Sequence, residues 1–202
     1  MLAERLGADA FGLLVGQRHV SNDFISLELA LKICDAVSPF ITPVLVTHLE
    51  DPADILSLAS ALPCPVIQLH SQLDAALLRE LSRKLRPKKI IALVSVEGEG
   101  AVKRAIELND CADAIVLDSI DRSTNRVGGT GLVHDWTLSA RIVKQTRIPV
   151  VLAGGLTPQN VRRAISTVKP WAVDVHSGVE TADGRKSEGL IQAFIAEAKI
   201  AA

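Results

Sequence analysis

The stretch that decides the fold reads Pro149-Val-Val-Leu-Ala-Gly-Gly-Leu-Thr-Pro-Gln-Asn160, a short apolar run followed by a glycine pair and a helix start. The run Pro149–Ala153 is almost continuously hydrophobic, which is typical of a parallel strand covered on both faces. Thr157 followed by Pro158 is typical of an N-cap with proline in the first turn, and predicts a helix over Gln159–Val168. The stretch is therefore one βα unit.

The same unit recurs along the chain. Short apolar runs predict seven strands, over Phe11–Val15, Pro43–Thr47, Pro65–Leu69, Lys89–Val96, Ala114–Leu117, Pro149–Ala153 and Ala172–Val175. Between the runs, apolar residues recur at helical spacing, as at Ile25, Leu29, Ile33 and Val37. Ser26 and Asp51-Pro52 supply further helix starts.

A repeating βα unit can close into a barrel or lie open as a doubly wound sheet. The open sheet that binds dinucleotides carries Gly-x-Gly-x-x-Gly after its first strand, whereas here Gly16-Gln-Arg-His-Val-Ser follows the first run. The glycine-rich loops come late in the chain, which favours a TIM (βα)8-type barrel. No linker or low-complexity segment interrupts the sequence, so we expect one α/β barrel domain over residues 1–202.

Composition and charge exclude several classes of protein. The 202 residues are 48% hydrophobic and 22% charged, with a formal net charge of −1, which excludes global disorder and gives no basic excess for nucleic acid. Three unpaired cysteines, no signal-peptide pattern and no run long enough to cross a membrane predict a soluble, cytoplasmic protein with reduced thiols. No histidine pair has metal-ligand spacing, so no metal site is expected. The expected partner is a small molecule or another protein.

Asp118 stands at the end of a predicted strand and opens a long loop that runs to Gly131. Strand ends form the catalytic face of a barrel, so a buried Asp118 with a raised pKa could act as a general acid. The alternative is a helix cap or a loop salt bridge. Within the loop, Gly128-Gly-Thr-Gly131 offers backbone N–H groups to an anion, although this motif is equally typical of a plain turn.

Two later loops predict a phosphate site. Gly154-Gly155 follows the sixth run, and Ser177-Gly178 follows the seventh within Asp174-Val-His-Ser-Gly-Val-Glu180. In barrels of this type, phosphate commonly binds to the loops after the last two strands. The alternative for each loop alone is simple turn chemistry, and the adjacent pair is what favours phosphate.

These segments resemble the phosphoribosylanthranilate isomerase family of tryptophan biosynthesis. The resemblance rests on their order: Gly7-Ala-Asp-Ala-Phe-Gly12, Gln68-Leu-His70, Asp118, Gly128-Gly-Thr-Gly131, His134-Asp135-Trp136, the Ala153–Val161 segment, then Asp174–Glu180. The family fold is a barrel, its substrate a phosphosugar, and its reaction a cofactor-free Amadori rearrangement.

The resemblance also implies roles for individual residues. Asp118 would be the general acid, and Arg18 would hold the anthranilate carboxylate. The other substrate-binding candidates lie in the matching motifs and are His70, Gly129, Gly131, Gly154, Gly155, Ser177 and Gly178. His176 stands where the family usually has a small polar residue; it could donate to phosphate, replace the base, or simply anchor its loop.

The family takes its general base from a Cys in a Lys-Xaa-Cys-Gly segment on strand 1, and these residues contain no such segment. Met1–Leu6 align with the end of helix 1, so strand 1 and most of the first helix are expected to be absent. Lys32-Ile-Cys34 is rejected as a replacement because Asp35 follows it and the segment is predicted helical.

Three explanations for the expected gap remain open. An upstream start could restore the Cys. A paralogue could have lost isomerisation while keeping its phosphate loops, which would leave a phosphosugar-binding or assembly protein. A partner chain, or self-association, could cover the open barrel edge.

Overall fold

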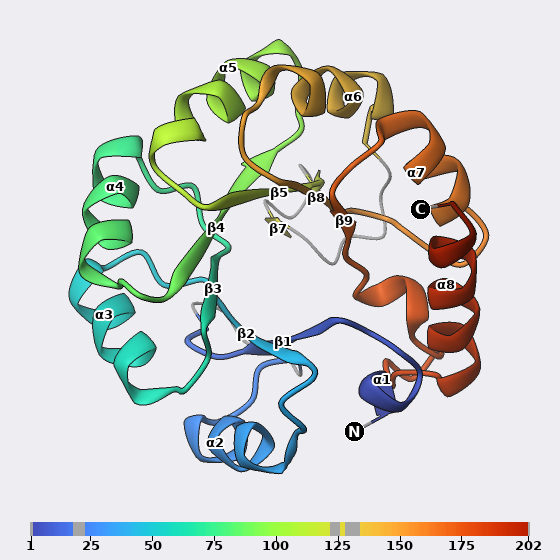
Figure 1. Ribbon diagram of the computed structural model, residues 1–202, viewed down its shortest axis with the longest axis horizontal. Helices are drawn as coiled ribbons and strands as arrows, with labels where there is room; N and C mark the ends of the chain where they lie inside the picture. Colours follow the sequence, from blue (N-terminus) through green and yellow to red (C-terminus); the bar gives the residue numbers. More distant parts are fainter. Residues whose placement is uncertain (1, 18–22, 122–125, 128–133, 202) are drawn as a thin grey trace. The chain divides into compact units, whose positions relative to one another are not determined.

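The computed structural model describes residues 2–17, 23–121, 126–127 and 134–201. Apart from the first two residues, the chain divides into two compact units. The first contains Ala3–Leu93 and Asp110–Asp113, and the second contains Val94–Asn109 and Ala114–Ala202. Each unit is an α/β arrangement of parallel strands and helices, which can be followed by colour along the chain (Figure 1).

The first unit places its strands side by side in chain order, all parallel. They are β1 (Ala10–Leu14), β2 (Thr42–Thr47), β3 (Val66–Leu69) and β4 (Lys89–Ser95), the last belonging to this unit as far as Leu93. Helix α1 (Leu2–Arg5) precedes β1, and α2 (Leu27–Ala36), α3 (Pro52–Ala61) and α4 (Ala75–Lys84) connect the strands. The order is that of successive βα units.

Apolar strands and capped helices explain why the first unit folds this way. Leu45, Ile67 and Ile90 on three neighbouring strands are each at most 1% exposed. Ser26 and Asp51 accept hydrogen bonds from the backbone N–H groups that open α2 and α3, so both predicted helix starts are confirmed.

The second unit holds the parallel strands β5 (Ala114–Asp118), β8 (Val150–Leu152) and β9 (Ala172–Val173), adjacent in that order. Its helices are α5 (Glu99–Glu107), α6 (Trp136–Gln145), α7 (Val161–Val168) and α8 (Glu188–Ala201), each packed against the next, with 3₁₀ turns η1 (Leu108–Asp110) and η2 (Ser177–Val179). The carboxyl ends of all three strands therefore lie at one edge of this sheet.

The seven predicted strands and the α/β fold class are confirmed, with small shifts at the strand ends. The helix after β8 was predicted to begin at Gln159, but α7 begins at Val161. Residues 158–160 form a turn that leads into it, in which Asn160 N and Val161 N both donate to Thr157 O, at 3.1 and 3.0 Å. The loop after Asp118 contains a short antiparallel hairpin, β6 (Ile120–Asp121) with β7 (Arg126–Val127), which was not expected. Helix α8 was also not expected.

Other expectations concern single residues and the ends of elements. Leu2–Arg5 is helical, in agreement with the expected end of a helix at this point. The three cysteines are free thiols. In the described part of the chain, the helices all fall short of the length and apolarity that crossing a membrane requires. Arg18, Gly129 and Gly131 lie outside the described residues.

The strand core gives a first prediction. Ile67→Ala should destabilise the protein by about 2–5 kcal/mol, because it removes a fully buried side chain and leaves a cavity. Ile106→Ala is the matched control, since Ile106 on α5 is 43% exposed, and we expect it to change stability by less than about 1 kcal/mol. Chemical denaturation measures both; equal losses would show that β3 is not part of the core.

Candidate active site

Three strand ends of the second unit meet around one pocket. Asp118 is the last residue of β5, Gly154 and Gly155 follow β8, and Ser177 and Gly178 follow β9. The remaining residues that line the pocket are Ala153, Leu156, Asp174, Val175 and His176. The five predicted site residues from these three loops are thus brought together.

Close approach of the loops requires glycine at two positions. At Gly154, where φ is +78°, a β-carbon would lie 2.5 Å from Ser119 Oγ and 3.0 Å from Asp118 Oδ1. At Gly178, a β-carbon would lie 1.8 Å from the carbonyl oxygen of Leu156. Real side chains cannot occupy such positions, so the glycines are what allow the ends of β5, β8 and β9 to converge.

Asp118 is a buried acid beside this pocket. Its residue is 5% exposed, and burial, which disfavours the charged form, raises the pKa of its carboxyl to about 7. A hydrogen bond of 2.6 Å from Ser119 N to Asp118 Oδ1 opposes the rise, and the negative charge of Asp174 adds to it. Asp118 therefore carries a proton through much of the range below neutral pH, as a general acid must.

The two glycine-containing loops present backbone donors. In the described part of the chain, the N–H groups of Gly154, Gly155, Ser177 and Gly178 donate to no protein acceptor. Asn160 holds the first loop in place: its Nδ2 donates to Gly155 O at 2.9 Å, and its Oδ1 accepts from Thr157 N at 2.8 Å. Such a set of fixed, unfilled N–H groups suits an anion.

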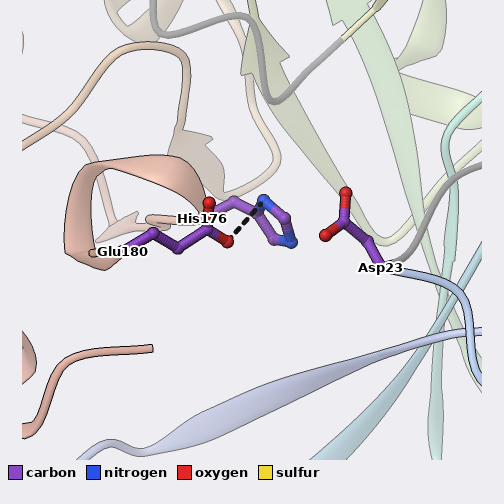
Figure 2. Close-up of side chains that lie close together, drawn as sticks. All are labelled: Asp23, His176 and Glu180. Carbon is purple, nitrogen blue, oxygen red and sulfur yellow. Dashed lines mark ion pairs between the residues drawn. The ribbon is translucent and has the colours of Figure 1, made fainter. Parts of the chain in front are cut away.

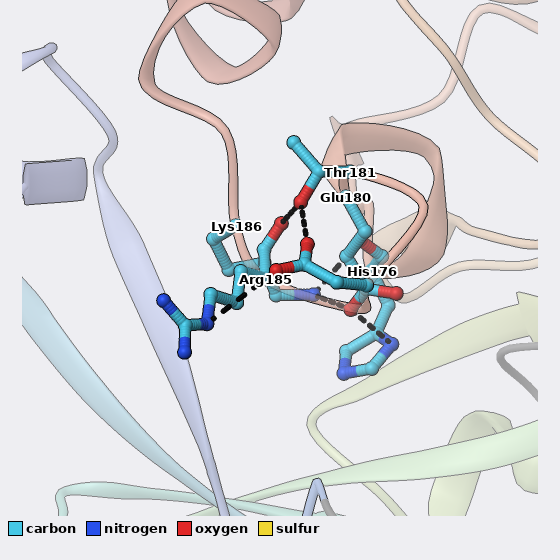
Figure 3. A network of polar contacts seen from close by, with 6 residues as sticks. His176, Glu180, Thr181, Arg185 and Lys186 are labelled. Carbon is cyan, nitrogen blue, oxygen red and sulfur yellow. Dashed lines mark hydrogen bonds and ion pairs between the residues drawn. The ribbon is translucent and has the colours of Figure 1, made fainter.

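The loop after β9 is held by a polar network. His176 Nδ1 lies 3.7 Å from Glu180 Oε1, and Figure 2 shows the imidazole turned toward that carboxylate. Lys186 Nζ donates to the same Glu180 oxygen at 2.5 Å and to His176 O at 2.9 Å (Figure 3). Thr181 N donates to Arg185 O at 2.8 Å and closes the following turn. These contacts fix the wall of the pocket that carries Ser177.

A second buried group lies next to Asp118. His134 Nδ1 is 3.2 Å from Ser119 Oγ, and His134 Nε2 is 2.8 Å from the hydroxyl of Ser139 on α6. Burial lowers the pKa of His134 to about 4, although the charge of Asp135 opposes this. The imidazole is therefore neutral at neutral pH. Asp135 itself caps α6 by accepting from Thr137 N at 2.8 Å.

The remaining predicted residue, His70, belongs to the first unit. It is 8% exposed, its Nδ1 lies 3.1 Å from Gln68 Nε2, and its ring centroid lies 5.0 Å from that of His48. Sequence reasoning missed two contributors in the second unit: Asn160, which was placed inside a helix, and the Ser119–His134 contact. A polar residue directly after Thr157-Pro158-Gln159 is the only signal for the first, and the second had none.

Comparison with known proteins identifies the family. The model of N-(5'-phosphoribosyl)anthranilate (PRA) isomerase matches residues 8–197. A Methanosarcina mazei protein named N-(5'-phosphoribosyl)anthranilate isomerase 2 is 42% identical over 98% of this chain and 88% of its own length. A Methanocella arvoryzae protein named N-(5'-phosphoribosyl)anthranilate isomerase is 34% identical over 96% of this chain and 89% of its own length.

Solved structures agree with the sequence comparison. Phosphoribosyl anthranilate isomerase from Thermotoga maritima is 34% identical, has a TM-score of 0.83 and is matched over 98% of this chain and 91% of its own. A structure of phosphoribosyl anthranilate isomerase in complex with reduced 1-(o-carboxyphenylamino)-1-deoxyribulose 5-phosphate has a TM-score of 0.80 at 34% identity, with the same coverage of both chains. The TIM-type α/β fold expected from the sequence is thus confirmed, and the chain belongs to the N-(5'-phosphoribosyl)anthranilate isomerase family of enzymes.

Proposed function

We propose that this chain converts N-(5'-phosphoribosyl)anthranilate to 1-(o-carboxyphenylamino)-1-deoxyribulose 5-phosphate, with Asp118 as general acid. One observation carries the proposal: a buried carboxyl whose pKa is about 7 lines the same pocket as four backbone N–H groups that find no protein acceptor among the described residues. A proton donor next to an anion site suits a substrate that carries a phosphate and a ring oxygen to be protonated. The family relationship supports the same reaction.

The chemistry follows from the position of the acid. Asp118 gives its proton to the ribose ring oxygen, the bond from that oxygen to C1′ breaks, and the nitrogen lone pair forms a protonated Schiff base. A base then takes the proton from C2′, which gives an enol that carries the amino group on C1′. C1′ gains a proton and the C2′ hydroxyl loses one, which gives the ketone. The proton that leaves C2′ and the proton gained by the ring oxygen balance, so neither an oxidant nor a cofactor takes part.

The phosphate is assigned to the loops after β8 and β9. Their N–H groups are neutral donors on loops fixed by Asn160 and Lys186. Fixed dipoles need no reorganisation when the anion arrives, which favours binding. The predicted roles of Arg18, Gly129, Gly131 and His70 toward the rest of the substrate remain predictions. The alternative of an impaired phosphosugar-binding paralogue is not favoured, because the relatives at 34–42% identity are named as isomerases.

The acid role predicts a loss of turnover. Asp118→Asn should reduce kcat by about 10²–10⁴-fold, because the amide cannot donate a proton to the ring oxygen as an acid does. Loss of phosphoribosylanthranilate fluorescence measures turnover, both in this chain and in a version preceded by a βα unit with the Lys-Xaa-Cys-Gly segment. Asp54→Asn, on the exposed side of α3, is the control. Unchanged turnover in Asp118→Asn would show that Asp118 takes no part in the mechanism. No turnover in either wild-type version would contradict the isomerase assignment.

The pKa of Asp118 predicts the pH dependence. The acid works only while protonated, so kcat/KM, which reports the free enzyme, should fall as the pH rises through about 7. The folded-state pKa is raised above the ordinary value of 3.8, which places this limb above the pH at which an exposed carboxyl would titrate. A profile of kcat/KM against pH tests this. A limb below pH 5 would mean that a solvent-exposed carboxyl is responsible.

The phosphate loops predict stabilisation by inorganic phosphate. Millimolar phosphate should raise the Tm by mass action on the folded state. Gly155→Asp should abolish the rise, since it adds a negative charge where the anion would bind. Gly184→Asp is the matched control: this glycine also has a positive φ (+79°, against +63° at Gly155) but lies in an open turn with nothing near its β-carbon position. Equal responses of the two variants would exclude the assigned loops.

Self-association, a cytoplasmic location and a single cooperative domain stay predictions. One solved relative is described as a dimeric phosphoribosylanthranilate isomerase from Thermotoga maritima. Each unit of this chain exposes a large apolar side chain, Phe40 at 93% and Trp171 at 81%. Sedimentation over a range of concentrations checks self-association, and a monomer at every concentration would contradict it.

A further inference from the structure

His134 makes two side-chain contacts with hydroxyl groups in the second unit. Ser119 Oγ lies 3.2 Å from Nδ1 and Ser139 Oγ lies 2.8 Å from Nε2. Both serines are buried, at 3% and 0% exposure. Ser119 directly follows Asp118, the last residue of β5, and Ser139 lies in the first turns of α6. The imidazole therefore ties the strand end that carries the acid to the helix that follows.

We assign the proton of the neutral imidazole to Nε2 from the contacts of Ser139. Ser139 Oγ also contacts Asp135 O at 3.5 Å, and a carbonyl oxygen can only accept, so the Ser139 hydroxyl donates there. The same hydroxyl oxygen then accepts from His134 Nε2–H. In a neutral imidazole, Nδ1 must in turn be an acceptor, and its partner is the hydroxyl hydrogen of Ser119.

We propose that His134 is a positioning residue: it holds the hydroxyl of Ser119 and thereby fixes the hydrogen bonding that the Asp118 carboxyl receives. A serine hydroxyl has one hydrogen, so while it is donated to His134 it is not available to the carboxyl. Ser119 Oγ and Asp118 Oδ1 both lie on the side of Gly154 where a β-carbon would stand, at 2.5 and 3.0 Å from that position. Ser119 N already donates to Asp118 Oδ1 at 2.6 Å, so rotation of the Ser119 side chain about its Cα–Cβ bond would carry a released hydroxyl toward the carboxyl.

Release of the Ser119 hydroxyl would change the pKa of Asp118. A hydroxyl that donates to a carboxylate stabilises its charged form, and so lowers the pKa of the acid. His134 thus preserves the state in which burial keeps Asp118 protonated near neutral pH. The inference rests on the proposed role of Asp118 only for its effect on turnover; the titration of Asp118 tests it independently.

Other charged groups near the pair are few in the described part of the second unit. Asp174, after β9, faces Asp118, and His176 and Lys186 in turn face Asp174. Asp135, at the start of α6, faces His134. The variants below leave all four unchanged, so differences in titration report on the Ser119–His134 contact.

The test is an NMR titration of the Asp118 carboxyl carbon, with its signal assigned by its absence in Asp118→Asn. His134→Phe should move the titration of Asp118 to lower pH by about one pH unit. His134→Asn places an amide oxygen near the position of Nδ1 and should restore the wild-type value. His134→Gln reaches toward Ser139 instead, and should behave like the phenylalanine variant.

A double variant that combines His134→Phe with Ser119→Ala shows whether the released hydroxyl causes the shift. If the shift in His134→Phe comes from the released hydroxyl, the double variant with Ser119→Ala should titrate at the wild-type pH. An Asp118 that titrates at the same pH in all the His134 variants would overturn the proposal and leave His134 a packing residue. Turnover separates the two claims: normal kcat in Asp118→Asn contradicts the proposed function, whereas unshifted titration contradicts only the role of His134.

Discussion

The second unit depends on the close approach of three backbone segments at the ends of β5, β8 and β9. A side chain at Gly154 would collide with Ser119 and Asp118, and one at Gly178 would collide with the carbonyl of Leu156. Because Gly154 and Gly178 have no side chains, Asp118 can lie close to the loops assigned to phosphate. The strands supply the framework, but the glycines determine that a pocket with polar backbone walls exists where the strands end.

Burial at this convergence acts on two titratable groups in opposite directions. It raises the pKa of Asp118 to about 7 and lowers that of His134 to about 4, because in each case the charged form loses its hydration. Both groups are consequently neutral just below neutral pH. A neutral acid can donate its proton, and a neutral imidazole can accept a hydroxyl hydrogen without competing for that proton. Burial thus favours the neutral form of both Asp118 and His134.

The strands and their order could be predicted from the sequence because buried parallel strands consist of short apolar runs. All seven predicted runs form strands in the structure. The positions of Asp118 and of the glycine loops followed from the same pattern. The start of α7 did not, since Asn160 bonds Thr157 N and Gly155 O and closes a turn where proline suggested a helix. The contact between Ser119 and His134 could not be predicted from the sequence either. The two residues are 15 positions apart, on either side of the segment with the β6–β7 hairpin, and no sequence periodicity indicates such a contact.

The protonation state of Asp118 also bears on how the pocket accepts an anion. Asp118 and Asp174 both line it, and two ionised carboxylates would repel a phosphate held by the neighbouring N–H groups. Protonation of Asp118 below its pKa of about 7 removes one of these charges, and desolvation also raises the pKa of Asp174, which favours its neutral form. The protonated form is therefore the better proton donor and also the better anion acceptor. The proposed phosphate binding and the proposed proton transfer therefore favour the same protonation state of one buried carboxyl.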